Sequence, residues 1–147
     1  DIIRTEDDLV IIMIGTNNRN SLGDINRLYA NLQSIINYCT EHNKEIILMS
    51  NIPASLTNEN KQSVMHMEDV DMIVGSVAKI NKLPWISVFK LMKNYLKNTG
   101  TSLDSILSDG LHPNDMGYDI MYYLITEAIG FSVPIENYTW TPTVLSV

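Results

Sequence analysis

The sequence predicts an α/β fold in which helices cover both faces of a parallel sheet. Short continuous apolar runs alternate along the chain with segments whose apolar residues recur at helical spacing. Strict alternation of this kind implies right-handed crossovers between parallel strands. In such sheets the active groups gather at the carboxyl ends of the strands, so polar motifs that follow a strand are candidate site residues.

Three apolar runs predict the strands. The first run ends at Gly15 and is typical of a strand that is buried on both faces. The second is closed by Asn51 and Pro53, and the third is shorter and contains Trp85. The predicted strands are residues 9–14, 45–50 and 85–89.

Apolar residues at helical spacing predict the helices between and after these strands. Either Ser21 or Asp24 can cap the first helix, which extends through Cys39. The second carries one apolar stripe from Val64 to Ile80. The later predicted helices are residues 60–82, 91–96 and 114–129.

Composition predicts one globular domain, since the 147 residues are 45% hydrophobic and 18% charged. The chain opens on Asp1 without a starting methionine, and we expect it to be cut from a longer one. Residues 131–147 contain Pro134, Pro142 and alternating Thr, Trp and Val. We predict an extended tail or linker for this segment, after a domain that occupies residues 1–130.

Charge and residue usage exclude several classes of function. The formal charge is −7, and the ten Lys and Arg residues are scattered, which argues against nucleic acid as a partner. No apolar run approaches the roughly 18 residues of a membrane span. The single cysteine, Cys39, lies in a helical pattern and is expected to be a buried apolar residue. The three histidines are too far apart for a metal site.

The motif Asp109-Gly110-Leu111-His112-Pro113 is the strongest chemical signal. Its spacing lets the Asp109 carboxylate reach back to His112 Nδ1, at about 2.6–3.2 Å, and hold the ring as a general base. Taken alone, the motif could also be a turn that starts a helix. The other histidines favour structural roles: His42 at the end of the first helix, near its dipole, and His66 partly buried on the second.

A second polar motif, Gly15-Thr16-Asn17-Asn18, directly follows the first predicted strand. Alone it is a common loop. Because it follows a strand of the parallel sheet, we expect it on the same rim as the Asp109 loop. The two motifs together, in this order and on this alternating pattern, indicate a hydrolase.

These two motifs, with Gly117 and Tyr118 in the last helix, resemble the SGNH (GDSL-type) hydrolase family. The resemblance implies a flavodoxin-like, three-layer α/β/α fold, of which this chain holds the C-terminal part with the last three strands. It also implies a Ser, His and Asp mechanism without cofactor or metal. By the resemblance, the catalytic residues are His112, Asp109 and Asn17, with Asn17 as the oxyanion donor, and the substrate-binding residues are Gly15 and Asn18.

The sequence departs from the family pattern in two ways. The Gly-Asp-Ser block that supplies the nucleophile has no counterpart, because the pair Gly23-Asp24 follows the asparagine motif and is continued by Ile25. Asp24 is therefore interpreted as a helix N-cap. Asn18 stands where the family most often has aspartate, which keeps the hydrogen bonding of the turn but removes a charge.

The resemblance implies an esterase or acetylesterase whose nucleophilic serine lies on a missing N-terminal segment. The expected substrate is an ester of a small molecule or a carbohydrate. We expect that segment, or a second chain, to complete the sheet beside the first strand. The alternative is a non-catalytic binding or assembly module that keeps the fold; a Gly-Asp-Ser motif upstream would separate the two hypotheses.

Overall fold

The computed structural model describes residues 3, 6, 8–62 and 64–130. Its three strands form one parallel sheet in the order β1-β2-β3, with Leu48 of the central strand opposite both Ile12 and Trp85. The strands are β1 (Leu9–Met13), β2 (Glu45–Met49) and β3 (Trp85–Ile86). The predicted α/β class and parallel sheet are confirmed, whereas the predicted tail at 131–147 lies outside the described residues.

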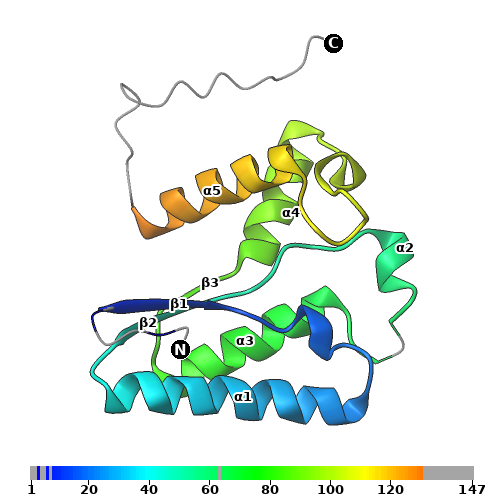
Figure 1. Cartoon of the computed structure of the whole chain (residues 1–147). Coiled ribbons are helices and arrows are strands. Elements are labelled where there is room, and N and C mark those ends of the chain that lie inside the picture. The colour runs from blue at the N-terminus through cyan, green and yellow to red at the C-terminus, as the bar shows by residue number, and fades with distance from the viewer. Residues whose placement is uncertain (1–2, 4–5, 7, 63, 131–147) are drawn as a thin grey trace.

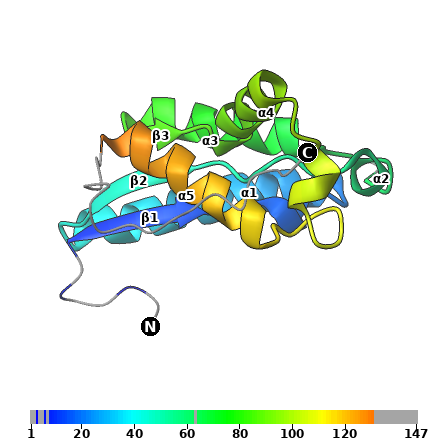
Figure 2. The same cartoon turned by 90° about the horizontal axis from the view of Figure 1, so that it is seen from above.

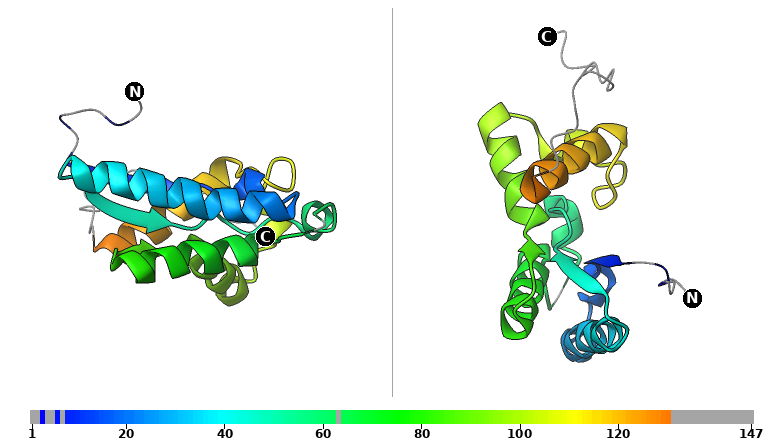
Figure 3. Two further views of the ribbon diagram at one scale, coloured as in Figure 1. Left: turned by 90° about the horizontal axis from the view of Figure 1, so that it is seen from below. Right: turned by 90° about the vertical axis from the view of Figure 1, so that its left-hand side faces the viewer.

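Helices cover both faces of this sheet. The helices are α1 (Leu22–Glu41), α2 (Leu56–Glu59), α3 (Met67–Asn81), α4 (Val88–Thr99) and α5 (Asp115–Ile129), with 3₁₀ turns η1 (Thr16–Asn18) and η2 (Leu103–Ile106). Helices α1 and α3 lie below the sheet in Figure 1, and α4 and α5 lie above it. The end-on view in Figure 3 shows the resulting three layers, and Figure 2 shows α5 running along the sheet.

Each face of the sheet has its own apolar core. Ile12, Ile46 and Leu48 face α1 and α3, where they pack with fully buried Leu28 and Val70. Cys39 is buried in the same core, as the sequence predicts. On the other face, Met49 and Ile86 pack against α4 and α5, through side chains that include Met92, Ile120 and Leu124.

Strand β1 is an edge of the sheet within the described part of the chain. Leu9 and Ile11 are 45% and 47% exposed on one face of the sheet, whereas Ile12, which points to the opposite face, is 6% exposed. The prediction that this strand is buried on both faces is therefore wrong for the described residues. Within the described residues, β1 pairs with β2 alone. An apolar edge of this kind is a template for pairing with another strand.

The third strand and the helix after it differ from the prediction. β3 contains two residues, because the Ser87 side chain accepts a hydrogen bond from the Lys90 N–H at 3.2 Å and starts α4 there. The predicted helix at 91–96 is in fact longer at both ends, and Gly100 in the left-handed conformation ends it.

The second predicted helix begins later than expected. Ser55 accepts from the Asn58 N–H at 3.2 Å and caps the short α2. Helix α3 then starts after His66, whose N–H donates to Asp69 at 2.7 Å. At α1 the N-cap is Ser21 and not Asp24, which instead accepts from the Ser21 hydroxyl at 2.7 Å. None of the helices in the described ranges is both long and apolar enough to cross a membrane.

Candidate active site

The turn after β1 is tight, and its first residue, Gly15, is buried. Gly15 has a φ of 122°, and a Cβ there would lie 2.6 Å from Val70 Cγ1. Its carbonyl accepts the Asn18 N–H at 3.0 Å and closes η1. Only glycine fits this conformation and this contact. The turn leaves Asn17 exposed at its centre, directly after the carboxyl end of β1.

The Asp109 and His112 side chains meet as their spacing predicts. Asp109 Oδ2 lies 2.7 Å from His112 Nδ1, within the predicted range. The other oxygen, Oδ1, accepts the backbone N–H groups of Leu111 and His112, at 3.0 and 2.8 Å. Both side chains are open to solvent, at 55% exposed for the aspartate and 67% for the histidine.

These hydrogen bonds fix the charge of the acid. They lower the pKa of Asp109 from its ordinary 3.8 to about 2, with the His112 N–H as the largest cause and its ring next. The carboxylate is therefore ionised across the ordinary pH range and can only accept hydrogen bonds. A neutral His112 must then carry its proton on Nδ1, which leaves the Nε2 lone pair free to act as a base.

Backbone bonds fix the shape of this loop. The Ser108 N–H donates to the His112 carbonyl at 2.8 Å, and Leu107 forms an isolated antiparallel bridge with Pro113. Asn114 then caps α5 by accepting from the Gly117 N–H at 3.0 Å. The acid and base are therefore placed by a closed turn at the start of a helix.

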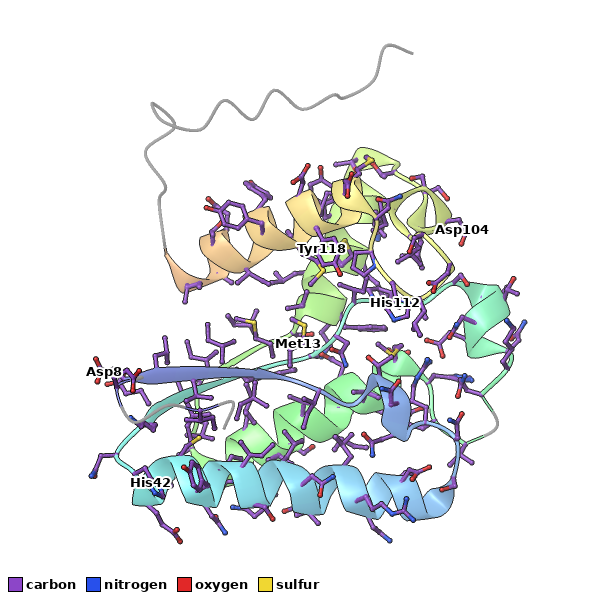
Figure 4. All side chains as sticks on the ribbon, in the orientation of Figure 1. Asp8, Met13, His42, Asp104, His112 and Tyr118 are labelled. Carbon is purple, nitrogen blue, oxygen red and sulfur yellow. The ribbon has the colours of Figure 1, made fainter. Side chains whose placement is uncertain are left out.

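Both motifs lie at the same end of the sheet. In Figure 4, His112 lies beyond the end of β1 that carries Met13, and Asp8 marks the opposite end. The η1 turn follows Met13 along the chain and lies at that same end in Figures 1 and 2. The expected rim at the carboxyl ends of the strands therefore exists, with Asn17 on one loop and His112 on another.

The remaining histidines lie at helix ends. His42 ends α1, and its Nδ1 lies 2.7 Å from the Tyr38 carbonyl, in agreement with the predicted contact with the helix end. Figure 4 places it far from His112. His66 is exposed at the start of α3, so the prediction that it is partly buried is wrong. In the ranges that the structure describes, no three acidic, His or Cys side chains come together as a metal site would require.

Sequence reasoning missed two residues that support the site. Ser55 donates its N–H to the Gly110 carbonyl at 2.8 Å, and Arg19 donates from Nε to the Thr16 carbonyl at 2.9 Å. Arg19 is only 2% exposed. A lone arginine after a polar turn gives no sequence signal for burial, because its partners Asn58 and Glu59 lie about forty positions away.

Comparison with known proteins identifies the family of the chain. The family model of the GDSL-like lipases and acylhydrolases matches residues 1–120. The chain belongs to the GDSL-like lipase/acylhydrolase family. No curated protein matches the chain significantly.

Solved structures of GDSL-like esterases share the fold. A variant of Axe2, an acetyl-xylooligosaccharide esterase from Geobacillus stearothermophilus, superposes with a TM-score of 0.67 at 23% identity, over 84% of this chain and 60% of that one. A GDSL-like lipase from Bacteroides thetaiotaomicron gives 0.63 at 24%, over 86% and 63%. The chain thus spans less than two thirds of these GDSL-like structures.

Further Axe2 structures identify the kinds of residue that its catalysis uses. One is an acetylxylan esterase variant with 25% identity to this chain and a TM-score of 0.66. The catalytic mutants of Axe2 replace a serine, an aspartate and a histidine. The aspartate and histidine of that esterase are three positions apart, and the serine comes far earlier in its chain.

Proposed function

We propose that this chain supplies the acid, the base and an oxyanion donor of a serine esterase that acts on an ester or O-acetyl group. The observation that carries the proposal is the 2.7 Å contact between Asp109 and His112, on the rim that also holds the Asn17 turn. The same three-residue spacing in the catalytic aspartate and histidine of Axe2 supports it.

In the proposed mechanism, His112 acts as base and then as acid in each half-reaction. His112 Nε2 removes the proton of a serine hydroxyl as the serine oxygen attacks the ester carbonyl. Asp109 stabilises the imidazolium that forms, and the Asn17 amide donates to the oxyanion. The imidazolium then protonates the leaving alcohol. In deacylation, His112 takes a proton from water as the water oxygen attacks the acyl-enzyme, and it gives that proton to the serine oxygen as the acid leaves.

We place the nucleophilic serine on a segment outside residues 1–147. Ser108, the serine closest in sequence to the base, donates its hydroxyl to the His112 carbonyl at 3.1 Å and not to the ring. The exposed edge of β1 supports the proposal, since a further strand placed there would extend the sheet. A covering segment would also shield the exposed pair from water and strengthen its electrostatics.

The turn that carries Asn17 also contributes to substrate binding in this proposal. Gly15 and Asn18 shape the turn that carries the oxyanion donor, and we assign them to the substrate-binding side. The acetylxylan esterase among the neighbours favours an O-acetylated carbohydrate over a small lipid ester. Parallel assays on an acetylated xylo-oligosaccharide and on a short-chain glyceride would distinguish the two.

The competing function is a non-catalytic binding module with the same fold. Solvent exposure of both Asp109 and His112 favours it, because acid–base pairs act best where water is excluded. In that case the natural polypeptide that contains the chain would carry no serine on the rim.

Hydrolysis of an activated acetyl ester tests the proposal. Chain 1–147 alone should give no rate above background, whereas the natural polypeptide that contains it should hydrolyse the ester and be labelled on one serine by a fluorophosphonate. Absence of both hydrolysis and labelling in that polypeptide would establish the binding module instead.

A further inference from the structure

Arg19 connects the turn that carries Asn17 to a distant part of the chain. It is the first residue after η1, and 2% of it is exposed. Each nitrogen of its guanidinium has an acceptor. Nε donates to the Thr16 carbonyl at 2.9 Å, Nη1 to Glu59 at 3.2 Å and Nη2 to Asn58 at 3.1 Å.

The carboxylate of Glu59 completes this network. Its second oxygen accepts the Met67 N–H at 3.1 Å, at the first turn of α3. Burial lowers the pKa of Arg19, and the charge of Glu59 opposes that change. Removing either partner would leave a poorly compensated charge inside the protein. The turn after β1 is thus tied by one side chain to α2 and, through Glu59, to α3.

Helix α2 also contacts the loop of the acid and the base. Ser55 at its start donates its N–H to the Gly110 carbonyl at 2.8 Å. The φ of Gly110 is 82°, and a Cβ on this residue would lie 2.5 Å from Ser55 Oγ. The backbone at Gly110 and the Ser55 side chain therefore approach each other closely. One short segment, residues 55–59, therefore touches the Asp109 loop at one end and Arg19 at the other.

We infer that Arg19 is a positioning residue for the oxyanion turn, which it holds against α2 at a fixed place relative to His112. The inference rests on the proposed function of Asn17. Three acceptors, one at each nitrogen of the guanidinium, match arginine and not lysine, because lysine offers a single charged point without the rigid fork. The geometry of the donor then depends on the shape of the Arg19 side chain as well as on its charge.

Backbone dynamics of chain 1–147 test the inference without any need for activity. Arg19→Lys should lower the ¹⁵N order parameters of the Asn17 and Asn18 amides from about 0.85 to below about 0.6. Arg27→Lys is the matched control, because Arg27 is 72% exposed and pairs with Asp24 on the surface; it should leave those amides rigid. Equal values in the two variants would overturn the inference.

A second variant covers the case in which Arg19→Lys does not fold. Glu59→Gln keeps the side-chain volume but removes the charge and one of two acceptors, so the same amides should lose order to a smaller extent. Unchanged order parameters in a folded Glu59→Gln chain would overturn the inference as well.

In the natural polypeptide, a double-mutant cycle separates positioning from general stability. Arg19→Lys should lower kcat roughly 10–100-fold with KM unchanged, since small displacements of catalytic groups have effects of that size. In an Asn17→Ala background, Arg19→Lys should lower kcat little further, because Arg19 acts through the Asn17 side chain that is then absent. Losses that multiply would contradict positioning. A polypeptide without hydrolysis would instead fail the proposed function and leave the dynamics test to decide on Arg19.

Discussion

The two loops of the candidate site are built in opposite ways. In the loop of Asp109 and His112, the hydrogen bonds of the Asp109 carboxylate are local: they join residues two or three positions apart, and both side chains are exposed. One long-range bond, from the Ser55 N–H, reaches the Gly110 carbonyl of the same loop. The turn that carries Asn17 depends on buried Gly15 and on Arg19, whose partners are about forty positions away. We conclude that the Asp109–His112 contact is made by local bonds, whereas the proposed oxyanion donor is placed by the packed fold.

The largest expected effect is on the base. His112→Ala in the natural polypeptide should lower kcat for an activated acetyl ester by roughly 10⁴–10⁶-fold, because His112 is the proposed base for the serine proton. His42→Ala is the control, since His42 lies at the far end of α1. Equal rates for the two variants would remove His112 from the mechanism.

The oxyanion donor should matter less than the base. Asn17→Ala should lower kcat by roughly 10²–10³-fold with little change in KM, because the amide acts mainly in the transition state. Steady-state kinetics on the same ester measure both constants. A rise in KM at constant kcat would show that Asn17 binds the substrate and does not stabilise the oxyanion.

The free energy of unfolding should distinguish the packed turn at Gly15 from the open helix end at Gly100. Gly15→Ala should lower the free energy of unfolding by about 2–4 kcal/mol, through its positive φ and its contact with Val70. Gly100 also has a positive φ, but an added Cβ there would have nothing within 4 Å. Gly100→Ala should therefore lower the free energy of unfolding by only about 1 kcal/mol. Urea denaturation measures both. Similar losses would mean that the turn after β1 adapts freely.

The smallest expected effect is on the pKa of Asp109. By ¹³C NMR, the Asp109 carboxyl should titrate near pH 2, and its pairing should be fully present above pH 3.8 and be lost as the pH falls through 2. His112→Ala keeps the backbone N–H at 112, so it should raise the pKa only part of the way to 3.8. A pKa of 3.8 in His112→Ala would show that the ring of His112, and not its backbone N–H, lowers the pKa of Asp109.

The same contrast explains how much the sequence could predict. Periodicity and buried apolar runs were sufficient for three parallel strands and their helices, and a three-residue spacing was sufficient for the Asp109–His112 contact. Predicted boundaries were wrong where a side-chain hydrogen bond starts a helix. Ser87 caps α4 and shortens β3, Ser55 caps α2, and the Asp69 carboxylate accepts the His66 N–H at the start of α3. Arg19 and Ser55 could not be found, because their roles arise from contacts made only after folding.

The protonation state of His112 in chain 1–147 tests the central claim most directly, because that claim is that the pair forms without the rest of the site. Imidazole ¹⁵N NMR of the neutral ring should show the proton on Nδ1, with Nε2 free, and Asp109→Asn should remove that preference. A ring with the proton mainly on Nε2, or one that does not respond to Asp109→Asn, would contradict a locally assembled acid–base pair.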